Sequence, residues 1–368
     1  MKKLIALILA LVFTSAPALS ALAENGPAGG PPPERSFGAL SLLNMTEEEY
    51  LALITVRGLL NERFGMSNPM KGEPEGQAPE GQPPEGAPED RPQQENKIIY
   101  YDTLDALLMA LNAGDIQNIE IYESVARYLC ATNDNLEIGR SFDFSKTSEA
   151  FAELMQKGFN CNDFAIMMME GNAALRDEFN DAIAAMKADG TLDRLVKEQI
   201  DDLIDGGEIK PIALPKIDDA ETVKVAVTGA LPPMDYVAAD GTPAGFNTAV
   251  LAEIANRTGK NIELVVVDSM GRAAALASGT VDAVFWTRTN SESQKLAGMT
   301  EAEREAEKAK GEADLTEEEI ALMNEIQEII DFPSYGATDM PEGTITTEPY
   351  FSDVLVPVKL AGGGPQGK

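Results

Sequence analysis

Histidine and cysteine, two residue types that often carry chemistry in active sites, are absent or rare in this chain of 368 residues. It contains no histidine, so the commonest general base and metal ligand is absent. Every Ser-His-Asp or Cys-His arrangement is excluded with it. No pair of acidic side chains has a spacing that places both across one cleft for acid–base work. We therefore expect a binding protein rather than an enzyme, with no cofactor and no metal site.

The N-terminus has the pattern of a signal peptide. Two lysines precede an apolar stretch, and Ala21-Leu22-Ala23 fits a small-residue cleavage site. Polar residues and a proline at 14–17 leave the apolar run too short to span a bilayer as a helix. No cysteine follows directly that could carry a lipid anchor. We expect a secreted chain, periplasmic or extracellular, that is soluble once the signal is removed.

Cys130 and Cys161 are the only cysteines. In an oxidising compartment they are expected to pair as a structural disulfide. The closed loop would stabilise the fold by roughly 3–4 kcal/mol. A zinc site is the poorer interpretation, because two cysteines without histidine leave it incomplete.

The charge balance excludes several kinds of partner. Lys and Arg number 29 against 61 Asp and Glu, a net charge of −32. Such a chain is repelled by nucleic acid and by anionic lipid surfaces. We expect neither a nucleic-acid partner nor membrane insertion after signal cleavage.

Apolar runs alternate with amphipathic stretches, which predicts an α/β fold with largely parallel sheets. Thr46-Glu47-Glu48-Glu49 fits a capping box at the start of one helix. The predicted strands are 36–43, 97–101, 116–122, 163–169, 223–227, 262–267, 283–286 and 353–360. The predicted helices are 46–64, 104–112, 124–130, 148–157, 172–188, 192–204, 246–258 and 272–277.

Two segments stand apart in composition. Residues 66–96 form a Pro-Glu-Gly-Gln repeat that cannot bury enough apolar surface to offset its ordering entropy. Residues 300–331 are acidic and helix-prone, which is typical of an inserted helical segment.

Three blocks of sequence carry a resemblance to a known family. Residues 221–294 include the Gly-Phe-Asn of 245–247, and 348–358 read EPYFSDVLVPV. Residues 102–192 contain a helix with the pattern ALNAGD and the closing sequence ADGTL. Together they resemble the bacterial extracellular solute-binding proteins of family 3, but in a different order. The resemblance implies a two-lobed periplasmic-binding-protein-like (type II) fold with permuted connectivity.

The block order has two explanations. One is a circularly permuted single protein, which we expect to be a monomer. The other is the tail of one copy fused to the head of a second. We favour permutation, because the pieces add up to about one copy and chain ends often lie close together. The expected division is signal peptide 1–23, linker 24–35, lobe two 36–168 with insert 66–96, lobe one 169–347 with insert 300–331, crossover strand 348–360 and tail 361–368.

The resemblance also implies a binding site, residue by residue. The family's ligand-binding threonine falls on Thr289, and its carboxylate-binding arginine falls on Gln294, so Arg288 is the substitute candidate. Its ammonium-binding acid falls near Tyr122 and Glu123. The remaining implied contacts are Thr228, Leu231, Ser269, Trp286 and Thr287.

Each candidate also has a structural interpretation. Arg288 could be an exposed charge on a loop, and Glu123 a solvated acid at a helix N-terminus. As the only tryptophan, Trp286 could pack in the core or stack on a ligand. The amino-acid clamp is therefore incomplete, although the scaffold resembles the family well.

Three function classes remain open. The first is the substrate-binding protein of an ABC importer, which would take an amino acid or similar small polar solute and dock on a permease. The second is a ligand-sensing or protein-interaction module on the same scaffold. An enzyme is the third and least favoured, because fold alone cannot argue for chemistry.

Overall fold

The computed structural model describes residues 35–43, 45–64, 66–67, 96–139, 141–142, 144, 147–155, 161–269, 271–289, 299–330 and 341–362. The predicted signal peptide 1–23, residues 24–34, positions 68–95 of the predicted linker and 363–368 of the tail lie outside these ranges. Within the described part, no helix combines the length and apolar character that crossing a bilayer requires.

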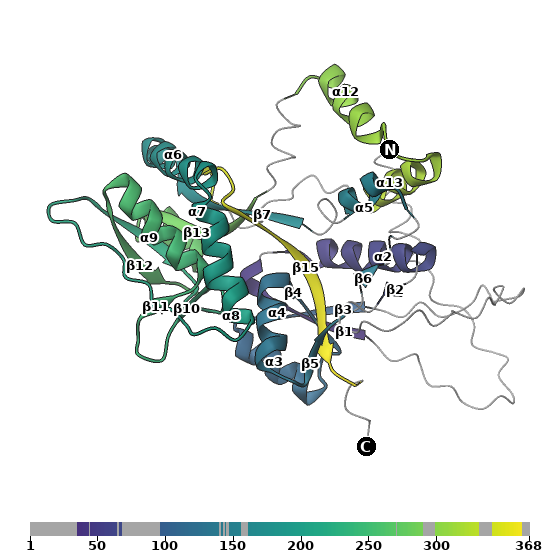
Figure 1. The fold of residues 1–368 in the computed structure, drawn as a ribbon, viewed down its shortest axis with the longest axis horizontal. Helices are drawn as coiled ribbons and strands as arrows, with labels where there is room; N and C mark the ends of the chain where they lie inside the picture. The colour runs from purple at the N-terminus through teal and green to yellow at the C-terminus, as the bar shows by residue number, and fades with distance from the viewer. Residues whose placement is uncertain are drawn as a thin grey trace, which may run out of the picture.

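A ten-stranded mixed sheet forms the centre of the described structure (Figure 1). Its order is β12-β8-β13-β7-β15-β4-β1-β3, with β14 paired to β7 and β5 to β15. The alternation of strands and helices confirms the predicted α/β class. In chain order, the strands are β1 (Arg35–Leu40), β3 (Asn96–Tyr101), β4 (Asn118–Tyr122), β5 (Leu136–Ile138), β7 (Cys161–Met169), β8 (Thr222–Val227), β12 (Asn261–Val266), β13 (Ala283–Thr289), β14 (Thr344–Thr346) and β15 (Phe351–Leu360).

Two groups of parallel strands meet at a central antiparallel pair. Strands β8, β12 and β13 form one group, called the β8 half, and β1, β3 and β4 form the other, called the β1 half. Between them, β7 pairs with β13 and β15 pairs with β4. The two central strands also pair with each other, with Phe351 opposite Phe164. These are the neighbour relations expected of a permuted chain, and permutation itself stays a prediction.

Helices cover the β8 half as its sequence pattern predicts. Nine residues of α9 are buried, and its last turn ends at Gly259 with a left-handed φ of 68°, a conformation that glycine adopts without steric cost. The predicted helix 192–204 is instead two helices separated by a π-helical turn at 197–201. The helices of this half are α6 (Ala173–Ala188), α7 (Thr191–Val196), α8 (Asp202–Ile204), α9 (Phe246–Thr258) and α10 (Arg272–Ala277).

In the β1 half, α3 (Leu104–Ala113) and α4 (Glu123–Thr132) pack on the sheet. The hydroxyl of Thr103 accepts a hydrogen bond from the Ala106 amide at 3.2 Å and caps the start of α3. One cluster of buried side chains extends from this half through β7 and β15 into the β8 half. The two halves are therefore joined by shared packing as well as by strand pairing.

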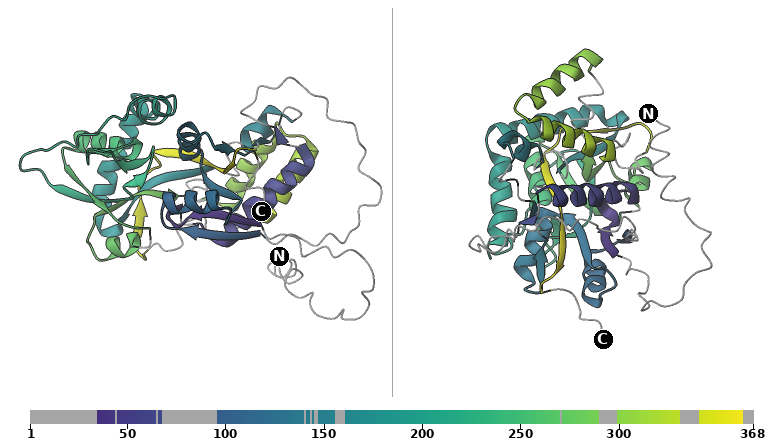
Figure 2. Two further views of the ribbon diagram at one scale, coloured as in Figure 1. Left: turned by 90° about the horizontal axis from the view of Figure 1, so that it is seen from below. Right: turned by 90° about the vertical axis from the view of Figure 1, so that its right-hand side faces the viewer.

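A separate apolar cluster joins segments far apart in sequence. Here α2 (Glu47–Phe64) lies beside α13 (Glu317–Ile330) (Figure 2). Val56 and Leu60 of α2 pack with Leu322 and Ile326 of α13. The predicted acidic insert is thus two helices. Of these, α13 supplies core contacts, whereas none of the described side chains of α12 (Glu301–Glu312) is buried.

Short elements complete the described chain. Around α2 and α13 lie α5 (Glu149–Leu154) and the two-stranded pair β2 (Met66–Ser67) and β6 (Ser141–Phe142). The start of the predicted linker is therefore paired as a strand, because its first residues precede the Pro-Glu-Gly repeat. A small sheet next to α9 contains β9 (Ala230–Leu231), β10 (Asp235–Val237) and β11 (Pro243–Ala244).

Candidate functional site

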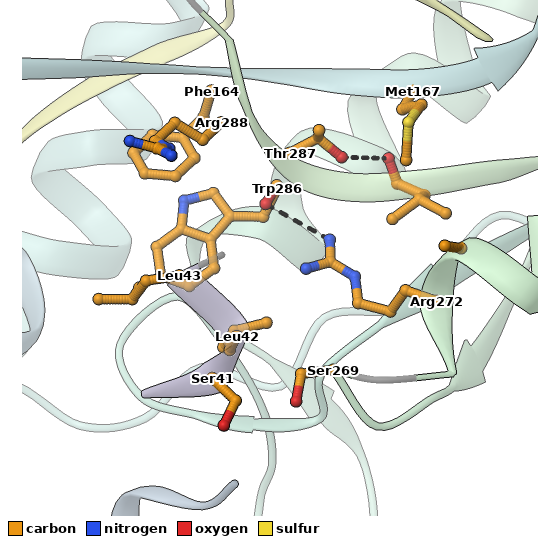
Figure 3. A pocket seen from close by; sticks show the side chains of 12 residues that line it. Ser41, Leu42, Leu43, Phe164, Met167, Ser269, Arg272, Trp286, Thr287 and Arg288 are labelled. Atoms are coloured by element: carbon orange, nitrogen blue, oxygen red, sulfur yellow. Dashed lines mark hydrogen bonds between the residues drawn. The ribbon is translucent and has the colours of Figure 1, made fainter. Parts of the chain in front are cut away.

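A cavity lies where the two halves meet (Figure 3). Its free volume of about 30 Å³ has room for about two water molecules. The β1 half contributes the turn Ser41–Leu43 that follows β1, and the opposite wall comes from the β8 half and from β7. Because the walls belong to different halves, separating the halves would enlarge the cavity. The lining residues are Ser41, Leu42, Leu43, Phe164, Met167, Ser269, Arg272, Ala273, Val284, Trp286, Thr287 and Arg288.

Trp286 occupies a strained position at the centre of this wall. Strand β13 has a bulge against β7 between Val284 and Thr287, and Trp286 has a φ of 53°. A non-glycine residue in this region costs of order 1–3 kcal/mol, and such strain often occurs at functional sites. The indole stacks on Phe164 with ring centroids 4.9 Å apart. The bulge therefore turns the indole toward the cavity wall while the strand continues.

Both interpretations of Trp286 have support. It is 3% exposed and belongs to the main core, and its ring also packs against Tyr122 at 5.7 Å. Its indole N–H has no hydrogen-bond partner among the described residues. A buried donor without an acceptor costs about 1–3 kcal/mol. A ligand or water that accepts from this N–H would remove that cost.

The predicted site residue Arg288 is buried and ion-paired, so the interpretation as an exposed loop charge is wrong. Its side chain is 4% exposed, and Nη2 donates to Oε1 of Glu49 at 2.9 Å and to Oε2 at 3.1 Å. Glu49 lies in α2, 239 residues away. The same carboxylate accepts from the Thr46 amide at 2.7 Å, which is the predicted capping box. The candidate arginine is therefore already paired with a carboxylate of the chain itself.

Arg272 is the charged lining residue that sequence reasoning missed. It is 9% exposed. Its guanidinium donates to the carbonyl of Phe285 and, at 3.4 Å, to that of Trp286, the bond drawn in Figure 3. The predicted residue Ser269 lines the same cavity, and its buried hydroxyl has no partner among the described residues. The only sequence signal for Arg272 is that it is the single charged residue of the helix RAAALA.

Two residues predicted to contact ligand on the first loop lie outside the cavity lining. Leu231 is 2% exposed and belongs to the main core. Thr228 donates its hydroxyl hydrogen bond to Asp235. The buried Asp235 also accepts from the Gly229 amide at 2.6 Å and from Asn247 Nδ2 at 3.0 Å. We infer a structural role for this loop, because its polar groups are satisfied within it.

The two residues at the predicted ammonium-binding position, Tyr122 and Glu123, differ in burial, and a third residue supplies the buried acid. Tyr122 is fully buried against Phe164 at 4.8 Å, whereas Glu123 is exposed at the first turn of α4. The acid that is buried here is Asp353 of β15, which accepts from the Ser124 amide at 3.2 Å. Burial raises the pKa of Asp353 to about 7, although its hydrogen bonds with Ser124 and Val354 act to lower it.

The two threonines beside Arg288 are both buried, Thr287 at 4% and Thr289 at 7% exposure. Thr287 lines the cavity and donates to the Val284 carbonyl at 3.4 Å, while Thr289 is not among the lining residues. The position Gln294, where the family's arginine is missing, lies outside the described residues.

The predicted disulfide is wrong for this structure, since Cys130 is a free cysteine. Its thiol is hydrogen-bonded to the backbone of Ile138, and burial raises its pKa. Ile138 pairs with Val358 of β15, whereas the backbone of Cys161 pairs with Val354, four residues earlier.

We expect reduction to leave the thermal midpoint of the protein unchanged, because Cys130 is free. Differential scanning calorimetry with and without a reducing agent measures this, with Cys130→Ser as the matched control. A disulfide worth roughly 3–4 kcal/mol would make the reduced sample melt about 6 °C or more below the oxidised one. A difference of that size, abolished in Cys130→Ser, would contradict the structure.

The site has binding groups but no recognisable metal set. Among the described residues, no group of three acids or cysteines is arranged to hold a metal ion. Two guanidinium groups, an indole and hydroxyls line the cavity. Hydrogen-bond donors that face one cavity from two halves are an arrangement with which proteins hold a polar solute.

The fold and cavity thus define an α/β protein with a candidate binding site between two halves. Residues 223–331 match the model of the bacterial extracellular solute-binding proteins, family 3. The predicted resemblance is confirmed for this part of the chain, which is under a third of its length. The matched family is one of solute-binding proteins, in agreement with the expectation of a binding protein. No curated protein matches the chain.

Several solved structures are similar in outline. One is the ligand-binding component of an ABC-type import system from Staphylococcus aureus, at TM-score 0.33 and 9% identity, covering 88% of this chain and 65% of that one. An alkanesulfonate-binding protein from Xanthomonas axonopodis has TM-score 0.30 and 12% identity, covering 87% and 88%. A phosphate-binding protein from Streptococcus pneumoniae has TM-score 0.31 and 9% identity, covering 89% of each. The chain thus spans slightly less than two thirds of the first of these.

Proposed function

We propose that this protein is the secreted substrate-binding component of an ABC importer and takes a small polar solute into the cavity between its halves. The observation that carries the proposal is the composition of the cavity walls. The turn Ser41–Leu43 comes from the β1 half, and Trp286 and Arg272 come from the β8 half. A ligand that touches both walls stabilises the closed arrangement, which is how two-lobed proteins retain solutes.

The family match supports the proposal from an independent direction. It covers 223–331, which includes β13 and α10, the elements that carry Trp286 and Arg272. In this proposal residues 1–23 are the export signal, the protein acts as a monomer outside the cytoplasm, and a permease is its partner. The order of the strands around β7 and β15 supports a permuted form of the family's two-lobed fold.

Ligand binding is expected to raise the thermal midpoint. At a free concentration 100-fold above Kd, one site stabilises the folded state by about 2.7 kcal/mol, which corresponds to about 5–10 °C for a domain of this size. A thermal-shift screen of the whole secreted chain should include amino acids, sugars, small inorganic anions and organic acids. If no solute moves the midpoint of a well-folded sample, the proposed transport function is wrong.

One observation favours the sensing or protein-interaction module as a second candidate. Glu49 of α2 pairs with Arg288 of β13, and α2 contacts β3 of the β1 half, so an ion pair within the chain links the two halves. The exposed helix α12 projects from the packed pair α2 and α13 (Figure 1). A folded protein that binds no solute, and that keeps its midpoint after removal of 301–312, would favour this second function.

A further inference from the structure

The charges that line the cavity are of one sign. Arg272 and Arg288 are the only ionisable side chains among the lining residues, and no Asp or Glu is among them. In the whole chain, acids outnumber Lys and Arg by 61 to 29. A cavity wall with two guanidinium groups and no carboxylate therefore departs strongly from the composition of the chain.

The neighbouring acids lie behind the wall. Glu49 contacts Arg288 from α2, and Asp102 accepts from the Ser41 hydroxyl at 3.0 Å, but neither carboxylate lines the cavity. The predicted ammonium-binding residue Glu123 is exposed at the start of α4 and is not part of the lining either. An ammonium group placed in this cavity would meet guanidinium groups and no carboxylate.

Arg272 is held in place by hydrogen bonds to the backbone of β13. Its Nη2 donates to the carbonyl oxygens of Phe285 and Trp286, which fixes the planar group beside the strained residue of β13. The buried hydroxyl of Ser269 lies in the same wall and has no partner among the described residues. A fixed guanidinium beside a hydroxyl donor matches the oxygen atoms of a carboxylate, sulfonate or phosphate group.

We propose that the cavity binds a small anion without an ammonium group, through Arg272 and Ser269, rather than a zwitterionic amino acid. This names the substrate class of the proposed solute-binding function and rests on it. Arg288 is the second cationic position, and Glu49 neutralises it until the halves separate. A ligand with two anionic groups can then replace Glu49 at Arg288 while Arg272 holds its first group.

Isothermal titration calorimetry of the whole chain at fixed ionic strength tests the proposal. The probes are sulfate, inorganic phosphate and succinate, compared with L-alanine and L-glutamine. At least one anion is expected to bind, and to bind at least about tenfold more tightly than either amino acid. An amino acid also offers a carboxylate, but its ammonium group would lie beside two guanidinium groups with no carboxylate in the lining to pair with it. If an amino acid binds and no anion does, the anion proposal is overturned while the solute-binding function stands. If none of the five binds to folded protein, the anion proposal is overturned, and the broader screen decides the function.

Variants locate the site. Arg272→Lys keeps the charge but loses the planar fork, and a loss of about tenfold in anion affinity is expected. Ser269→Ala should lose about threefold in anion affinity and does not disturb the backbone contacts of Arg272, so it decides the matter if Arg272→Lys does not fold.

Glu49→Gln tests the second cationic position. It keeps a capping acceptor, removes the carboxylate that pairs with Arg288 and should tighten succinate binding. Glu301→Gln, on α12, removes the same charge as Glu49→Gln at an exposed position, so it is the charge-matched control and should change nothing. Anion affinity that is the same in Ser269→Ala and Glu49→Gln as in the native chain would overturn the assignment.

Discussion

Replacing Arg288 with alanine is expected to destabilise the protein by about 3–5 kcal/mol, because Glu49 would remain as an uncompensated buried charge. The two side chains are 4% and 3% exposed, so water cannot solvate the remaining carboxylate. Chemical denaturation followed by circular dichroism at pH 7 would measure the loss. Arg304→Gln, at the exposed surface of α12, is the control and should change stability by less than about 0.5 kcal/mol.

The paired variant separates the ion pair from its desolvation cost. Arg288→Met with Glu49→Gln removes both charges and keeps a capping acceptor at the start of α2. It should recover most of the stability that Arg288→Ala loses, since an apolar replacement of a buried pair is often neutral. A loss below about 1 kcal/mol for Arg288→Ala would show that Glu49 is solvated and that the pair does not link the halves.

Stability is expected to fall as pH rises from about 4 to about 7, through Asp353. Its pKa is raised to about 7 by burial, with the nearby Glu123 adding to the rise, whereas an unfolded aspartate titrates near 3.9. Between these values the folded protein retains a proton that the unfolded chain has lost. The protonated form therefore contributes fully below about pH 4, and this contribution is lost by about pH 7, roughly 4 kcal/mol in all by linkage.

Asp353→Asn isolates this effect, because the amide stays neutral and keeps an oxygen to accept from the Ser124 amide. Denaturation curves of both proteins at several pH values between 4 and 8 are the measurement, and only the difference between them is interpreted. The variant should gain stability relative to the native chain as pH rises, up to a few kcal/mol at pH 8. A difference that stays constant with pH would mean that Asp353 is ionised throughout the range.

The local elements were predictable because their signals are short-range. The predicted helix 246–258 has the bounds of α9, and the predicted strand 223–227 differs from β8 by one residue. The capping box at Thr46 and Glu49 was also read correctly. Hydrophobic period and cap chemistry depend on neighbours a few residues apart, so the sequence contains them directly.

The candidate site was only partly predictable. Ser269, Trp286, Thr287 and Arg288 do line the cavity, whereas Thr228, Leu231, Tyr122, Glu123 and Thr289 are not among its lining residues. Arg272 was missed, because one arginine on a short alanine-rich helix has no pattern that distinguishes a buried cation from an exposed one. The disulfide was predicted only from the expected oxidising compartment and from the presence of two cysteines. Neither observation says how far apart Cys130 and Cys161 lie.

By itself, the sequence determined the alternation of strands and helices, the absence of histidine chemistry and the resemblance of its middle segment to a solute-binding family. Tertiary structure alone decided which charges meet. Glu49 reaches Arg288 across 239 residues, and Arg272 reaches the carbonyl groups of β13. Such contacts depend on how β7 and β15 bring the two halves together. Long-range pairing of this kind leaves no periodic pattern in the sequence, because the distances between these residues are set only when the complete sheet has formed.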